Sequence, residues 1–183
     1  MKLKMFIALS SVLIILALVY FFFKPVNKID HITELSPYIW QVETDQIVHI
    51  TITLPRRGRG ESWFKKEDFH WYFDDQDETP VDIARWGGGI PLILSGPRSS
   101  RELITENAEG VEEQYGLLEP GMIIKLLLNT GEEINVLVGD KLLDGSAYYI
   151  KLIHAPRIFT IDESWVSVLE NLVLDPPLQG ITK

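Results

Sequence analysis

An uncharged apolar run, Met5–Phe23, opens this chain with the sequence MFIALSSVLIILALVYFFF. At a helical rise of about 1.5 Å per residue, a run of this length reaches about 28 Å, the thickness of a bilayer core. Its aromatic end and the following Lys24-Pro25 do not suit signal peptidase, which needs small residues at its cut. The sequence therefore predicts a retained, single-pass transmembrane helix, with residues 1–28 as the anchor and its flanks.

The side of the membrane is argued from positive charge close to the apolar run. Two lysines precede the run and two follow it, so the α-amino group breaks the tie. Positive charge favours the cytoplasmic side. We expect a cytoplasmic N-terminus, with the rest of the chain on the opposite side of the membrane.

The remainder of the chain is strongly acidic. The sequence has 17 Lys and Arg against 26 Asp and Glu, and four of the lysines but none of the acids precede residue 29. Residues 29–183 therefore carry a net charge of −13, which repels phosphate backbones and argues against a nucleic-acid partner. The chain has no cysteine, which excludes disulfides, thiol nucleophiles and thiolate metal sites.

The length after the anchor suits one folded domain of the α+β class. We expect a tether at 29–37, a soluble domain at 38–177 and a tail at 178–183. The sheet is expected to be mainly antiparallel, with a C-terminal meander and a packed C-terminal helix.

Two segments of the first half alternate with the period of a strand. Gln46–Leu54 places Val48, Ile50, Ile52 and Leu54 on one face, as in a half-buried strand. The aromatic cluster that follows places Phe69, Trp71 and Phe73 on a shared face. Core packing is the simpler interpretation of this aromatic face, and contact with a pigment or a lipid is the alternative.

The sequence predicts loops, turns and short helices in three further segments that precede the second half of the sheet. Arg56–Gly60 is expected to be a solvated loop, because glycines interrupt its three arginines. Pro80–Trp86 predicts a helical turn that the glycines after it stop, and Glu102–Glu119 predicts a partly helical acidic segment that ends at Gly116.

The second half predicts consecutive antiparallel strands and a final helix. The strands are expected at Met122–Leu128, Glu133–Val138, Ser146–Ile153 and Ile158–Ile161, with turns at Asn129-Thr130-Gly131 and Asp144-Gly145. Asp162 is a good N-cap for a helix that Pro176-Pro177 ends. Its apolar stripe is Trp165, Val168, Leu169 and Leu172.

No residue pattern predicts a catalytic, cofactor or metal site. The histidines at 31, 49, 70 and 154 have no ligand spacing, and the acidic run Asp74–Glu78 lacks the register of a calcium loop. Ser95 and Ser146 lack a nucleophile elbow, and the adjacent Glu112 and Glu113 point in different helical directions. We therefore expect a protein that is not an enzyme, with no catalytic, cofactor-binding or metal-binding residues.

The second half of the chain, from about Trp86, resembles the bacterial family known as domain of unknown function 4340. The matching residues are Tyr115-Gly116-Leu117, Pro120, Gly131, Gly139-Asp140, Asp144-Gly145, Tyr148-Tyr149 and Pro156. The short length, the single N-terminal helix, the segment Leu94–Arg98 and the closing Trp165 with Asp175-Pro176-Pro177 are similar to the small cyanobacterial members.

This resemblance implies a cyanobacterial protein of the thylakoid (or inner) membrane that assists assembly of the photosystem II reaction centre through protein contacts. Combined with the expected cytoplasmic N-terminus, it places the domain on the lumenal or periplasmic side. The expected partners are the membrane and an assembly intermediate of photosystem II. Because the family also includes auxiliary components of gliding-motility and other ABC transporters, a transporter accessory subunit is the first alternative. An uncharacterised ligand-binding domain or hydrolase is the second.

Overall fold

The computed structural model describes residues 37–86, 89–103 and 110–179, all of which lie in the unit Ser36–Lys183. The predicted anchor Met5–Phe23, the tether before residue 37 and the last four residues lie outside the described part. Within the described part, the structure has no helix that is both long and apolar enough to cross a bilayer.

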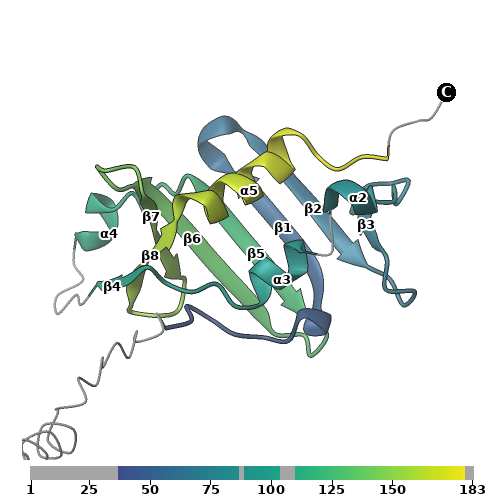
Figure 1. Cartoon of the computed structure of the whole chain (residues 1–183), viewed down its shortest axis with the longest axis horizontal. Helices are drawn as coiled ribbons and strands as arrows, with labels where there is room; N and C mark the ends of the chain where they lie inside the picture. Colours follow the sequence, from purple (N-terminus) through teal and green to yellow (C-terminus); the bar gives the residue numbers. More distant parts are fainter. Residues whose placement is uncertain (1–36, 87–88, 104–109, 180–183) are drawn as a thin grey trace, which may run out of the picture. The chain divides into compact units, whose positions relative to one another are not determined.

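Eight strands form one sheet in the order β3-β2-β1-β5-β6-β7-β8-β4 (Figure 1). Their bounds are β1 Ile47–Leu54, β2 Arg59–Lys65, β3 Trp71–Phe73, β4 Arg101–Leu103, β5 Met122–Leu128, β6 Glu133–Lys141, β7 Ala147–Leu152 and β8 Ile158–Asp162. Each pair of neighbouring strands runs antiparallel. The predicted α+β class with a mainly antiparallel sheet and a C-terminal meander is therefore confirmed.

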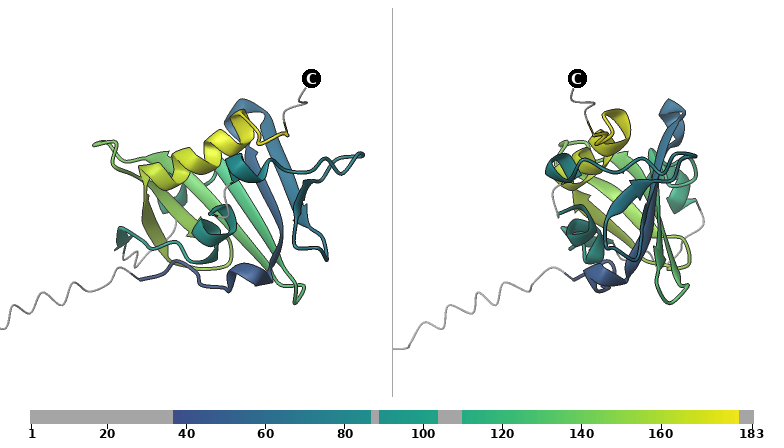
Figure 2. Two further views of the ribbon diagram at one scale, coloured as in Figure 1. Left: turned by 45° about the vertical axis from the view of Figure 1, so that its right-hand side comes forward. Right: turned by 90° about the vertical axis from the view of Figure 1, so that its right-hand side faces the viewer.

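The C-terminal helix α5, Glu163–Leu174, lies across one face of this sheet and contacts β1, β2, β7 and β8 (Figure 1). A short helix, α3 (Ile90–Ser95), lies on the same face, as the two views of Figure 2 show. The indole Nε1 of Trp165 donates to the carbonyl oxygen of Ile93 at 3.0 Å and joins the two helices. We call this the helical face.

The remaining short elements flank the sheet. They are η1 Thr44–Gln46, η2 Pro55–Arg57, α2 Ile83–Trp86 and α4 Val111–Gln114. α2 also packs on the helical face, because its Trp86 contacts the inward-facing Trp63 of β2. α4 lies on the opposite face, where Glu112 forms an ion pair with Lys151 of β7.

The core fills the space between the sheet and the helical face. Central strands β1 and β5 contribute Ile50, Ile52, Ile124 and Leu126, none of which is more than 1% exposed. Burial of each such side chain stabilises the fold by about 1.5–3 kcal/mol, before the opposing loss of conformational entropy.

The local signals of the second half are confirmed. Gly131 and Gly145 lie in their turns at φ 85° and 76°, in the left-handed region that glycine adopts without strain. The Asp162 carboxylate accepts the Ser164 N–H at 2.8 Å and so caps α5, as predicted. The helix ends at Leu174, immediately before Asp175 and the two prolines.

In each of two elements, one residue predicted to face the core does not. In β1 the pairing with β5 shifts between Ile47 and His49, so Val48 is an extra residue and Ile47 is buried in its place. In α5 the predicted core residue Val168 is 44% exposed, whereas Val166 and Val173 are buried with Leu169 and Leu172. Apolar periodicity placed Ile50, Ile52 and Leu54 of β1 and Leu169 and Leu172 of α5 correctly in the core, and was wrong only at Val48 and Val168.

The predicted loop at Arg56–Gly60 is partly confirmed. Pro55–Arg57 forms a 3-10 turn and Gly58 has φ 61°, but β2 already begins at Arg59. Pro80–Trp86 contains the predicted helical turn as α2, and Glu102–Glu119 contains α4 in its described part.

Candidate functional site

Three tryptophans pack together where the β2–β3 edge of the sheet meets α2. Trp86 of α2 lies 5.3 Å from Trp63 of β2 and 5.4 Å from Trp71 of β3, measured between ring centroids. Trp63 is fully buried and Trp86 is 4% exposed. This packing forms the innermost wall of a cavity that opens to the surface at Trp71.

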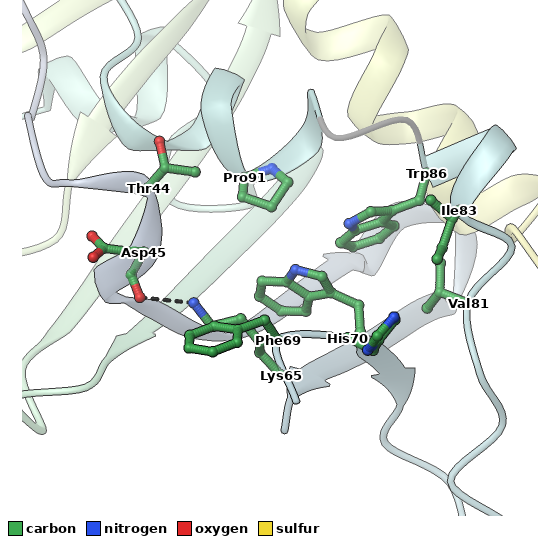
Figure 3. Close-up of a pocket in the computed structure, with 10 residues that line it drawn as sticks. Thr44, Asp45, Lys65, Phe69, His70, Val81, Ile83, Trp86 and Pro91 are labelled. Atoms are coloured by element: carbon green, nitrogen blue, oxygen red, sulfur yellow. Dashed lines mark hydrogen bonds between the residues drawn. The ribbon is translucent and has the colours of Figure 1, made fainter. Parts of the chain in front are cut away.

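The cavity, which we call the tryptophan pocket, has a volume of about 380 Å³ (Figure 3). This is within the size range of small-molecule sites. Apolar walls come from Trp71, Trp86, Val81 and Pro91, and two exposed apolar side chains, Phe69 and Ile83, stand at its rim. The polar lining residues are Thr44, Asp45, Lys65 and His70.

The indole Nε1 of Trp86 is buried and has no hydrogen-bond partner among the described residues. Figure 3 shows this nitrogen on the side of the ring that points toward Pro91, across the pocket. A buried donor without an acceptor costs about 1–3 kcal/mol. Trp63 has the same unpaired Nε1 but does not line the pocket.

Lys65 and Asp45 form the polar side of the pocket. The ammonium of Lys65 donates to the backbone carbonyl of Asp45 at 2.7 Å and lies 6.0 Å from the ring centroid of Trp71 (Figure 3). The carbonyl bond fixes the ammonium near the aromatic wall, a position that cation–π attraction favours. The carboxylate of Asp45 points away from the pocket (Figure 3).

Phe69 does not lie in the core, and its predicted place beside Trp71 and Phe73 was wrong. It is 78% exposed, whereas Phe73 is 4% exposed. Its φ of 65° is in the left-handed region, which costs a non-glycine residue roughly 1–2 kcal/mol. The turn that holds it is closed by Phe69 N–H to the Lys66 carbonyl at 2.9 Å and Lys66 N–H to the His70 carbonyl at 3.1 Å.

A second polar group lies on the face of the sheet opposite α5. His49 Nε2 is 3.1 Å from an Asp74 carboxylate oxygen and 3.3 Å from Ser62 Oγ. Thr51 Oγ1 is 2.9 Å from Ser62 Oγ. β1, β2 and the residue after β3 thus bring together a serine, a histidine and an aspartate that have no common sequence motif.

This group differs from a nucleophilic relay in one decisive respect. In a relay the carboxylate holds Nδ1 of the histidine, and Nε2 is left to take the serine proton. Here Asp74 and Ser62 both approach Nε2, while Nδ1 lies 3.5 Å from Thr51 Oγ1. The arrangement crosslinks neighbouring strands and does not activate Ser62.

The acidic run Asp74–Glu78 is a turn that uses its own carboxylates. Asp75 Oδ1 accepts the N–H groups of Thr79 at 3.0 Å and Asp77 at 3.1 Å. The hydrogen bond from Thr79 is the main cause that lowers the pKa of Asp75. Glu78 forms an ion pair with Lys66. This matches the predicted solvated acidic turn.

Other residues considered from the sequence are dispersed. Within residues 37–86, 89–103 and 110–179, no three His, Asp or Glu side chains gather as metal ligands would. His70 lies at the tryptophan pocket and His154 is exposed elsewhere, whereas His31 lies outside the described residues. Ser95 donates to the Leu92 carbonyl at 2.8 Å.

The tryptophan pocket itself was not predicted. Lys65 and Trp86 belong to no recognisable binding motif. Phe69 was predicted to lie in the core only because it continues the two-residue period of a strand. The signal that was present is Lys66-Glu67-Asp68, a polar break inside the aromatic run, which favours a turn at Phe69.

Several residues that carry the family resemblance meet at one place in the fold. Tyr115 stacks on Tyr149 with ring centroids 4.2 Å apart. Asp140 N–H donates to the Tyr115 carbonyl at 2.8 Å, next to an irregularity in the β6–β7 pairing between Val138 and Lys141. A Cβ on Gly139 would lie 2.1 Å from the Tyr115 carbonyl oxygen. These residues fasten the segment after α4 to the sheet.

No family model, curated protein or solved structure matches this chain.

Proposed function

We propose that this chain is a membrane-anchored accessory factor that works through protein contacts rather than through chemistry. The observation that carries this proposal is that two apolar side chains of the helical face are exposed to solvent. Leu92 of α3 is 61% exposed and Val168 of α5 is 44% exposed, although both belong to helices that pack on the sheet.

The two helices that carry these side chains are held together. The hydrogen bond from Trp165 to the Ile93 carbonyl joins α5 to α3, and Trp40 packs edge-on against Trp165 at 6.2 Å between ring centroids. Because the two helices are already joined, docking a partner on them orders little additional backbone. They are suited to a modest interface with a partner.

A modest interface suffices for a protein that is tethered to the membrane. The tether confines the domain near its partner and raises the effective concentration, so weak contacts become stable. The Met5–Phe23 run supports this proposal, and the resemblance of the second half favours an assembling photosystem II reaction centre in the thylakoid as the partner.

The test uses native electrophoresis of membranes from cells that carry the full chain or its variants. Leu92→Glu with Val168→Glu introduces charge at the proposed interface. Leu143→Glu is the matched control, because Leu143 is fully exposed on the turn between β6 and β7. We expect the double variant to leave the large complex and the control to remain in it.

A wild-type chain that migrates only as a free monomer would contradict the proposal, as would normal photosystem assembly after its deletion. An ATPase and a permease among the co-purified proteins would instead support the accessory subunit of a transporter.

A further inference from the structure

We propose that the tryptophan pocket binds a flat, apolar, uncharged small molecule whose single carbonyl oxygen accepts the indole N–H of Trp86. This site is separate from the Leu92 and Val168 surface, and it does not depend on the proposed protein partner.

The unpaired donor is the first argument. Trp86 is only 4% exposed and lines the pocket, and its indole N–H has no acceptor among the described residues. A ligand oxygen that reaches this nitrogen removes the cost of burying an unpaired donor. The adjacent indole rings of Trp71 and Trp86 in the pocket lining favour a planar ligand, because flat rings stack with large contact area.

Charge decides between a neutral and an anionic acceptor. The Lys65 ammonium at the pocket is already held by the Asp45 backbone carbonyl at 2.7 Å, and the Asp45 carboxylate points away from the pocket (Figure 3). The rest of the domain is strongly acidic. A ketone, ester or quinone-type carbonyl therefore suits the pocket better than a carboxylate.

The rim supplies the movement that the site needs. The Trp86 nitrogen is covered, so an acceptor reaches it only after the pocket wall shifts. Phe69 and Ile83, which are 78% and 59% exposed, are the lining side chains with room to change rotamer. The left-handed φ of Phe69 is strain held at this rim, and such strain is typical of ligand clamps.

The test compares two probes of nearly equal shape, 2-acetylnaphthalene and 2-isopropylnaphthalene, of which only the first has an acceptor. The full chain in detergent micelles is labelled with ¹⁵N at its five tryptophan indoles. We expect saturable binding of the ketone, a downfield shift of the Trp86 N–H resonance, and binding about three- to tenfold tighter than that of the hydrocarbon.

Trp63 is the matched control, because its Nε1 is equally buried and unpaired but lies outside the pocket. Its resonance should not move downfield, and Trp63→Phe should keep the preference for the ketone. Trp86→Phe should abolish that preference. If Trp86→Phe does not fold, the other four Trp→Phe variants assign the Trp86 resonance by elimination, and the wild-type titration decides.

Phe69→Gly tests the rim without straining the turn, because glycine adopts the left-handed region freely. We expect this variant to fold at least as well and to bind both probes more weakly. Equal binding of the two probes, a ketone preference that survives Trp86→Phe, no saturation, or unchanged binding by Phe69→Gly would overturn the proposal.

Discussion

At the scale of single residues, Glu61 shows how burial opposes ionisation in an acidic domain. It lies on β2 opposite Ile52, on the face that is covered by the helices. Burial raises the pKa of its carboxyl above the ordinary value of 4.5, Arg59 lowers it in part, and Asp75 raises it further. The ionised carboxylate is therefore less favourable in the folded chain than in the unfolded chain.

Glu61→Gln should stabilise the domain at neutral pH. Above the raised folded pKa the wild-type carboxylate is ionised in both states, so the whole penalty is present. As the pH falls through the folded pKa and then below 4.5, the penalty disappears. We expect a gain of about 0.5 kcal/mol at pH 7, small because the group is only partly buried and solvent screens it, and none at pH 4.

Urea denaturation of both forms at several pH values measures this gain. Glu132→Gln, an exposed turn residue, removes the same charge and is the control. An equal gain from both variants would show that net charge, and not the burial of Glu61, is responsible.

Residue-scale features are also where the sequence predicts least. Alternation located β1 but could not reveal the extra residue Val48, because a bulge depends on how the partner strand is paired. Phe69 was wrongly predicted to face the core because the two-residue period of β3 does not extend back to it. The polar residues before Phe69 indicate a turn there and not a strand. Side-chain type alone gave no sign that Trp86 would be buried without an acceptor.

At the scale of elements, the segment after α4 is fastened by backbone contact with β6. Gly139 makes this possible, since any Cβ there would meet the Tyr115 carbonyl oxygen at 2.1 Å and Gly116 C at 3.2 Å. Both are backbone atoms, which cannot move aside as a side chain can. The hydrogen bond from Asp140 N–H to Tyr115 depends on the same approach.

Gly139→Ala should therefore lower the free energy of unfolding by about 3 kcal/mol or more. Its control is Gly121→Ala, whose added Cβ would have its nearest neighbour at 3.7 Å, an ordinary contact. The control should cost less than about 1 kcal/mol. Chemical denaturation measures both, and equal losses would contradict the explanation.

Element identity was much better predicted than element packing. The strands of the C-terminal meander, its glycine turns and the capped helix α5 follow from local signals of period, positive φ and capping. The side of α5 that meets the sheet was assigned wrongly at Val168, because a short apolar helix offers more than one possible stripe. Residues from η1, β2, β3, α2 and α3 line the tryptophan pocket. Patterns within a single element do not predict which elements come together in this way.

At the scale of the whole molecule, the described domain carries its own core. The buried residues of β1, β5 and α5 pack against one another within Ser36–Lys183. Removing residues 1–28 should leave a folded domain with a cooperative thermal transition within a few degrees of that of the full chain. The same truncation should remove the protein from its membrane complex, because the tether supplies the effective concentration.

Differential scanning calorimetry and membrane fractionation measure the two outcomes separately. A truncated chain without a cooperative transition would show that the first residues contribute to the fold. A folded, truncated chain that still co-migrates with the complex would show that the contact surface is strong enough without a tether.

The strand order has a consequence for the time at which the sheet can form. β1 pairs with β2 on one side and with β5 on the other, so Ile52 lies opposite both Glu61 and Ile124. The first hairpin leaves the ribosome early, but the second edge of β1 stays open until β5 has been synthesised. β5 to β8 and α5, by contrast, are joined by short connections and close quickly. We therefore expect the C-terminal meander to form the folding nucleus. The nascent N-terminal hairpin should need protection from pairing with other chains until β5 has emerged from the ribosome.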